Sequence, residues 1–205
     1  MPKQEAPLLQ LQSYLPEGSF DEVLEYLNRY KVHLTISRKR QTILGDYRHA
    51  GNGKTHRISV NGTLNKYAFL ITLLHELAHL FIFEEFGQKA MAHGKEWKAE
   101  FSGILTRFLA KKIFPPDIEL ALLKTLRNPA ASSCGDEKLL RVLHRHDEKK
   151  AGVLLVEQIP DGGLFSISGN RVFKKGDKVR KRYKCTDIRT GVLYLFSAVY
   201  EVSAL

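Results

Sequence analysis

The sequence is poor in cysteine and has no long apolar run. Its 205 residues contain two cysteines, Cys134 and Cys185, which are too few for the disulfide scaffold of a small secreted domain. No run of eighteen apolar residues is free of charge or histidine, so no transmembrane helix is expected. Residues 1–5, Met-Pro-Lys-Gln-Glu, also lack the pattern of a signal peptide. These absences predict a cytoplasmic protein that does not associate with a membrane.

Acidic residues are also scarce. The chain has 22 Asp and Glu against 32 Lys and Arg, and its formal charge is +10. The imbalance is largest between Arg171 and Lys184, where eight basic residues accompany one acid, Asp177, for a net charge of +7. A basic excess of this kind indicates a polyanionic partner such as nucleic acid.

Part of this basic stretch has the alternation of a β-strand. In a strand over residues 178–184, Arg180, Arg182 and Lys184 would share one face. Cations along one side of a strand can follow a phosphate backbone, and a nearby aromatic ring can stack on a base. A solvated edge strand, in which lysines deter aggregation, is the alternative interpretation. The predicted nucleic-acid contacts are Lys178, Arg180, Lys181, Arg182, Tyr183 and Lys184.

The main motif is His75-Glu76-Leu77-Ala78-His79, which lies within an apolar helical segment. Residues four apart share one face of a helix, so His75 and His79 can bind one metal ion. Glu76 is placed to take a proton from a metal-bound water. Unpaired His and Glu side chains in a buried helix would cost several kcal/mol, and metal binding removes that cost. The pattern predicts a catalytic zinc site.

His93 is the predicted third ligand. It lies between two small residues at the start of a second helical segment, and Gly87 ends the motif helix, so a short loop can bring His93 over the site. The alternative is a glutamate from the second helix, where Glu96 and Glu100 are both available. Three imidazoles with an open fourth position are typical of a catalytic zinc, and we expect one Zn²⁺ per chain.

These residues resemble a known family. The run at residues 75–79, a loop of about a dozen residues, and His93-Gly94 followed by Trp97 resemble the SprT-like metallopeptidases, to which the Spartan DNA–protein crosslink proteases belong. Trp97 replaces a phenylalanine of the family as the large packing aromatic. The resemblance implies a zinc endopeptidase, with DNA-associated proteins as candidate substrates. It covers about residues 20–130, and includes the expected strands at residues 32–36, 44–47 and 57–61.

The chain departs from the family in its cysteines. Many members carry a zinc ribbon built on four cysteines, which this chain cannot form. A second metal site from Cys134, His144, His146 and Cys185 is conceivable, but two histidines at positions i and i+2 of a helix point to different faces. We therefore expect two buried or half-buried thiols that bind no metal.

The period of the apolar residues changes from helical to alternating along the chain. With the resemblance, this predicts an α+β fold: a zincin-like helical core with a small N-terminal β-sheet, followed by a small antiparallel β module. Helices are expected over residues 21–30, 65–87, 94–113, 117–126 and 137–150, and strands over 32–37, 42–49, 56–60, 153–159, 164–168, 178–187 and 192–202. The expected divisions are an N-terminal extension (1–18), a SprT-like metallopeptidase core (19–130), a linker with a charged helix (131–151) and a basic antiparallel β module (152–205).

Three functions fit these features. The first is a zinc metallopeptidase in which Glu76 is the general base that activates water against a peptide carbonyl. The second is a nucleic-acid-binding protein with a non-catalytic zinc site, and the third is a zinc-dependent hydrolase of a non-peptide amide. An intact Glu76 favours the first over the second, because a purely structural zinc needs no base. The candidates for stabilising the carbonyl oxygen are His33, Tyr47, His49, His56, Tyr67 and Arg107.

Overall fold

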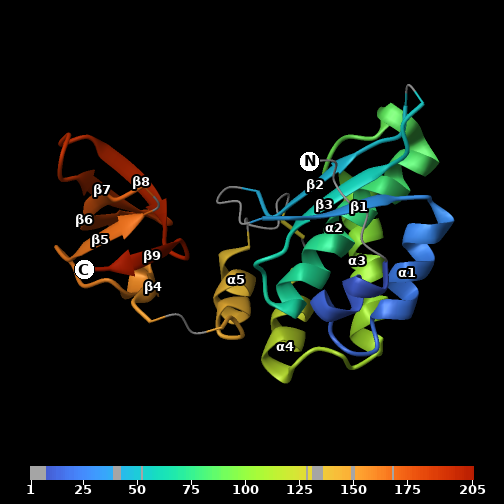
Figure 1. The fold of residues 1–205 in the computed structure, drawn as a ribbon, viewed down its shortest axis with the longest axis horizontal. Helices are drawn as coiled ribbons and strands as arrows, with labels where there is room; N and C mark the ends of the chain where they lie inside the picture. Colours follow the sequence, from blue (N-terminus) through green and yellow to red (C-terminus); the bar gives the residue numbers. More distant parts are fainter. Residues whose placement is uncertain are drawn as a thin grey trace. The chain divides into compact units, whose positions relative to one another are not determined.

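The computed structural model describes residues 8–38, 43–51, 53–127, 129–130, 136–148, 151–167 and 169–205. The chain divides into two compact units, Met1–Asp147 and Glu148–Leu205. Helices and a small mixed sheet form the first unit, and an antiparallel sheet forms the second (Figure 1). The predicted α+β class is confirmed.

The first unit is built on one long central helix and a three-stranded sheet (Figure 1). The strand order is β1-β3-β2, with β1 parallel and β2 antiparallel to β3, so β2 is an edge strand. Helix α2 packs against β2, β3 and α3. The elements are η1 (Leu8–Tyr14), α1 (Phe20–Arg29), β1 (His33–Ser37), β2 (Gly45–Arg48), β3 (Arg57–Asn61), α2 (Lys66–Phe86), η2 (Gly87–Lys89), α3 (Lys95–Ala110), α4 (Pro116–Thr125) and α5 (Glu137–His144).

Helix α2 forms the centre of the first hydrophobic core. Its N-cap is Asn65, whose side-chain oxygen accepts from the backbone N–H groups of Tyr67 and Ala68, and it ends at Gly87, which has φ 60°. By length and composition the segment Lys66–Lys89 could cross a membrane, but 72% of its most apolar window is buried inside the protein. Its apolar faces are therefore covered by α3 and the sheet, as in the core helix of a globular unit.

Two segments that we expected outside the metallopeptidase core contribute described residues to the hydrophobic core of the first unit. We expected residues 1–18 to be an extension, but Leu11 and Leu15 are buried in the core cluster. We expected residues 131–151 to be a linker with a charged helix, but Leu139 and Leu143 of α5 are buried in the same cluster. Helix α5 is amphipathic, so its few apolar residues, spaced at helical intervals, are enough to bury one face.

Helix α5 is also shorter than the predicted helix over residues 137–150. It ends at His144, because the next residues, Arg-His-Asp-Glu, offer no apolar side chain to continue the buried face. Its C-terminal end is tied to the start of α2: the Asn65 side-chain amide donates to the Leu143 carbonyl at 3.0 Å and to Asp147 Oδ1 at 2.5 Å. One asparagine thus caps α2 and holds the end of α5.

The second unit is a six-stranded antiparallel sheet in the order β4-β9-β5-β6-β7-β8. Its separate core is lined with aromatic and aliphatic side chains, among them Phe165, Phe173 and Phe196. The elements are β4 (Val153–Leu155), η3 (Val156–Gln158), β5 (Leu164–Ile167), β6 (Arg171–Val179), β7 (Arg182–Asp187), β8 (Leu193–Ser197) and β9 (Glu201–Ala204). We predicted single strands over 153–159 and 192–202, but the first ends in a 3₁₀ turn and the second is divided into β8 and β9.

The predicted strand over residues 178–187 was wrong in an important respect. Strands β6 and β7 pair as a hairpin in which Val179 lies opposite Arg182, so Arg180 and Lys181 form the turn. Arg180 has φ 56°, a conformation that such turns require and that asparagine or glycine usually supplies. The sequence therefore carried no turn signal, and an alternating run of cations was mistaken for one strand.

Candidate functional site

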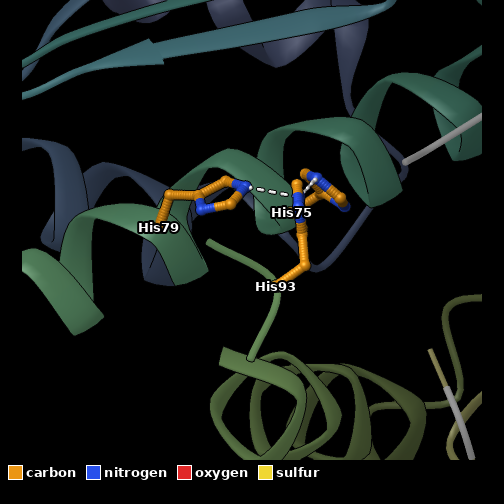
Figure 2. A group of neighbouring side chains, drawn as sticks. All are labelled: His75, His79 and His93. Atoms are coloured by element: carbon orange, nitrogen blue, oxygen red, sulfur yellow. Dashed lines mark hydrogen bonds between the residues drawn. The ribbon is translucent and has the colours of Figure 1, made fainter. Parts of the chain in front are cut away.

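The imidazoles of His75, His79 and His93 converge on one point. The distance between His79 Nε2 and His93 Nε2 is 2.9 Å, and that between His93 Nε2 and His75 Nε2 is 3.3 Å. In a search of the described residues, these three form a group whose possible ligand atoms all lie within 4.8 Å of one another. Figure 2 shows the rings of His75 and His79, from α2, turned toward the ring of His93. The predicted three-histidine arrangement is thus brought together by the fold.

Two local features produce this convergence. His75 and His79 are one helical turn apart on α2, and therefore project from the same face. The chain then turns back through η2, and the N–H of Gly94 donates to the Met91 carbonyl at 2.9 Å, which closes a tight turn around His93. His93 has φ 58°, a left-handed conformation that costs a non-glycine residue roughly 1–2 kcal/mol. Backbone strain of this kind is typical of functional sites.

Trp97 of α3 packs against all three rings. Its ring centroid lies 4.6 Å from that of His75, 5.2 Å from that of His79 and 4.6 Å from that of His93. The side chain is fully buried, and its Nε1–H has no hydrogen-bond partner in the described part of the chain. Trp97 therefore acts through its shape, as a wall that limits how the imidazoles can rotate.

The three imidazoles fit a zinc ion in both charge and spacing. Burial lowers the pKa of His75 to about 3 and that of His79 to about 4, with smaller contributions from the neighbouring histidines, and burial also lowers the pKa of His93. All three are therefore neutral near pH 7, as zinc ligands must be. Nitrogens bound tetrahedrally at about 2.0–2.1 Å lie about 3.3 Å from one another, close to the spacing of these Nε2 atoms.

The glutamates of α3 lie outside this group of three histidines. Glu96 Oε1 is 3.7 Å from Lys95 Nζ, and Glu100 Oε1 is 3.8 Å from Arg107 Nη2. Both are carboxylates beside a cation at the protein surface. The geometry therefore favours His93 over either glutamate as the third ligand.

Glu76 is buried beside the histidines, and strand β2 passes directly over it. The side chain of Glu76 is 5% exposed. A Cβ atom added to Gly45, the first residue of β2, would lie 2.5 Å from Glu76 Oε1 and 2.7 Å from Thr72 Cγ2. Real side chains do not approach so closely, so only glycine leaves the carboxylate in its place. We did not identify Gly45 from the sequence, although glycine within a strand often marks a close approach.

Gly45→Ala should therefore displace Glu76 and leave the histidines intact. We expect hydrolysis to fall by about tenfold or more, because misplacing a catalytic group by about 1 Å can cost a hundredfold. Zinc content, measured by elemental analysis, should not change. The matched control is Gly103→Ala on α3, where an added Cβ meets nothing within 4 Å. Equal activity of the two variants would show that Gly45 does not position the carboxylate.

Tyr47 lies two residues after Gly45 and also faces α2. Its ring is stacked on that of His79, with centroids 6.4 Å apart, and its hydroxyl lies 2.9 Å from His56 Nδ1. The N–H of Ala50 also points at this nitrogen, from 3.3 Å, while His56 Nε2 lies 3.1 Å from Glu84 Oε1. Nδ1 is thus the acceptor and Nε2–H the donor. Burial and the charge of Glu84 raise the pKa of Tyr47, which keeps the phenol protonated.

The structure separates the six candidates for stabilising a carbonyl oxygen. Tyr47 and His49 line the same pocket as His79. Tyr67 instead packs against Phe114 and His146, and Arg107 lies over the ring of Tyr26 and beside Glu100. His56 contacts the site through Tyr47, and His33 lies on β1, which β3 separates from β2. The candidates beside the histidines are therefore Tyr47 and His49.

The basic residues of the second unit form an exposed hairpin with one buried lysine. Lys175 is 4% exposed, and its ammonium donates to the carbonyl of Ile159 at 2.6 Å. Tyr183 faces the core side of β7, with Lys175 Nζ 4.3 Å and Lys178 Nζ 5.5 Å from its ring centroid. Its ring is thus in contact with two cations of the same hairpin. The exposed cations of the hairpin are Lys174, Lys178, Arg180, Lys181, Arg182 and Lys184.

The conceivable second metal site finds no support among the described residues. Cys134 lies outside them. Cys185 is buried, and burial raises the pKa of its thiol. His144 Nδ1 is 2.7 Å from Asp147 Oδ2, and His146 Nε2 is 3.1 Å from Asp117 Oδ1. Both histidines are accounted for by carboxylate partners within the first unit.

Comparison with known protein families gives a match over the first unit. The family model described as the SprT-like family matches residues 13–113. This interval contains the three-stranded sheet, α2, α3 and every residue of the histidine site. Searches among curated proteins and among solved structures found no significant match.

Proposed function

Because residues 13–113 belong to the SprT-like family, we propose that the protein is a zinc-dependent metallopeptidase that cleaves polypeptide chains internally. The observation that carries this proposal is the convergence of three neutral imidazoles beside a buried carboxylate, with the Nε2 atoms of His75 and His93 3.3 Å apart. A carboxylate next to a three-nitrogen site is the combination that peptide hydrolysis needs.

The chemistry follows from the positions of the side chains. His75, His79 and His93 would hold the zinc, which when bound polarises a carbonyl oxygen and makes a water molecule acidic. The Glu76 carboxylate accepts the proton that the water loses as its oxygen bonds to the carbonyl carbon. The same carboxyl group then gives this proton to the peptide nitrogen, so the C–N bond breaks and the amine leaves uncharged. Trp97 keeps the imidazoles in orientation while this happens.

The other two functions remain as alternatives with different expected behaviour. A non-catalytic zinc would not require a carboxylate buried under a glycine of β2, so the contact between Gly45 and Glu76 favours catalysis. The deciding experiment incubates the zinc-loaded full chain with an unfolded polypeptide such as casein and, separately, with proteins acetylated on lysine. We expect fragments of casein and no release of acetate. Acetate release without peptide cleavage would favour the hydrolase of a non-peptide amide.

We further propose that DNA-associated proteins are the substrates, and that the β6–β7 hairpin brings the chain to DNA in the cytoplasm of its cell. The support is six exposed cations on one hairpin of the second unit. The hairpin geometry changes the predicted surface: Arg182 and Lys184 share one face of β7, and Arg180 and Lys181 project from its tip. A hairpin tip can approach phosphates from several sides, and its binding depends on charge more than on base contacts.

Replacing Arg180, Arg182 and Lys184 with serine should weaken DNA binding. Removing three phosphate contacts should lower the affinity by about tenfold or more at low salt and reduce the slope of log affinity against log salt by about three. Fluorescence anisotropy with single- and double-stranded DNA measures both quantities. The control replaces three exposed cations of the first unit, Lys54, Lys124 and Arg127, with serine. If both triple variants lose the same affinity, net charge matters and the hairpin is not a specific DNA-binding element.

A further inference from the structure

A pocket opens directly beside the histidine site. Its volume is about 210 Å³. His79 is both a predicted zinc ligand and part of the pocket wall, and Trp97, which packs on all three histidines, forms another part. The pocket therefore begins at the metal centre, and any group held there lies next to the reacting carbonyl.

The pocket is lined mainly by apolar and aromatic side chains. Ile82 and Phe83 come from the last turns of α2, and Met91 comes from the loop before His93. Tyr47 completes the wall from strand β2. Among the described residues that line it there is no Asp, Glu, Lys or Arg. A charged side chain entering this pocket would lose part of its hydration and gain no counter-charge.

The size of the pocket suits one large side chain. A protein cavity of about 150 Å³ lined by apolar residues accommodates a benzene ring. At about 210 Å³, this pocket has room for a leucine, methionine or phenylalanine side chain. The walls are held in place from behind: Trp97 is fully buried, Ile82 is 8% exposed, and His49 stacks on Phe83 with ring centroids 4.5 Å apart. The pocket is therefore preformed, and binding requires little rearrangement.

We infer that this pocket is a specificity subsite, which binds the apolar side chain of a substrate residue adjoining the scissile bond. The inference rests on the proposed peptidase function and extends it to a substrate class. Consecutive Cα atoms are about 3.8 Å apart, so a chain with its carbonyl at the histidines places one neighbouring side chain at the pocket mouth. The enzyme should then prefer polypeptide sites with leucine, methionine or phenylalanine at that position, and reject aspartate, glutamate and lysine.

Binding can test the subsite without relying on hydrolysis. The probes are short peptide hydroxamates, whose hydroxamate group binds zinc and presents one side chain beside it. Two series place the variable side chain on either side of the hydroxamate, because a chain can cross the site in two directions. The zinc-loaded Glu76→Gln full chain is titrated calorimetrically with leucine, alanine and aspartate members of each series. In one series, we expect the leucine probe to bind on the order of tenfold to a hundredfold more tightly than the aspartate probe.

Met91 provides matched variants for the same titration. Its side chain is 77% exposed at the pocket rim, so substitution should not disturb folding. Met91→Glu should weaken the binding of the leucine and aspartate probes. Met91→Lys should instead increase the affinity for the aspartate probe by about fivefold or more. The control is Leu120→Glu on α4, a similarly exposed apolar residue that does not line the pocket. It should leave every affinity unchanged, and zinc content is measured for each variant.

Equal affinities for the leucine and aspartate probes in both series would overturn the subsite, as would identical effects of Met91→Glu and Leu120→Glu. The peptidase proposal is examined separately, by digesting a mixture of peptides with the zinc-loaded wild-type chain. Apolar residues enriched on one side of the cleaved bonds would support the inference. If no peptide is cleaved while the leucine preference holds, the pocket stands as an apolar binding site at the metal centre and the proposed peptidase function fails.

Discussion

Glu76→Gln should abolish most of the peptide hydrolysis and leave zinc binding unchanged. The amide that replaces the carboxylate cannot accept the proton of the attacking water, and the expected loss is about a hundredfold or more. Because glutamine has nearly the same shape as glutamate, it fits beneath Gly45 without moving β2. The measurements are the cleavage rate of an unfolded polypeptide by the zinc-loaded chain and its zinc content by elemental analysis.

The matched control is Glu85→Gln, an exposed carboxylate of the same helix. It removes the same charge from α2 and should leave the rate within a factor of about two, since this exposed carboxylate is not part of the group of three histidines. If Glu76→Gln retains activity within a few-fold of the wild type, another group is the base. The metallopeptidase proposal would then lose its main chemical support.

His93→Ala should lose zinc. The two remaining imidazoles on α2 supply only two of the four ligands of a tetrahedral zinc ion. Loss of a residue that merely hydrogen-bonds to a zinc ligand typically lowers the zinc affinity by about ten- to a hundredfold, and loss of a ligand should lower it by more. His93→Asn is the companion variant, because asparagine tolerates the left-handed backbone that His93 adopts at φ 58°. Competition with a chelator measures the affinity, and wild type should contain about one zinc per chain.

The alternative ligands provide the comparison. Glu96→Gln and Glu100→Gln should retain the wild-type affinity, since each carboxylate lies beside a surface cation in the described structure. If His93→Ala still binds zinc and one of the glutamine variants does not, the third zinc ligand is that glutamate and not His93. The loop carrying His93 would then be a structural turn of no catalytic importance.

The local features of this protein could be predicted from its sequence. The helix that carries His75 and His79 follows from apolar residues between Asn65 and Gly87, and the structure has the cap and the end at those residues. Such features depend on contacts within a few positions of the chain, which residue spacing determines directly. The position of His93 over the site also followed from a short loop, because few residues leave the chain few paths.

Contacts between distant segments appeared only in the tertiary structure. The close approach of Gly45 to Glu76, and the contact of Tyr47 with His56, depend on the register of β2 on β3 and on the packing of that sheet against α2. A shift of one residue in this pairing would turn every side chain of β2 to the other face. The residues around Gly45 do not indicate which register β2 and β3 adopt.

The basic stretch illustrates the same limit in the second unit. The sequence by itself determined that eight cations are concentrated between Arg171 and Lys184, and charge at this density favours a polyanionic partner in any fold. The tertiary structure decided which of them meet solvent, by placing Lys175 in the core and the turn at Arg180 and Lys181. The position of this turn depends on how the two strands on either side of it pack, which fixes their register. The cations at the turn have no apolar face to bury, so their own side chains do not determine where the turn lies.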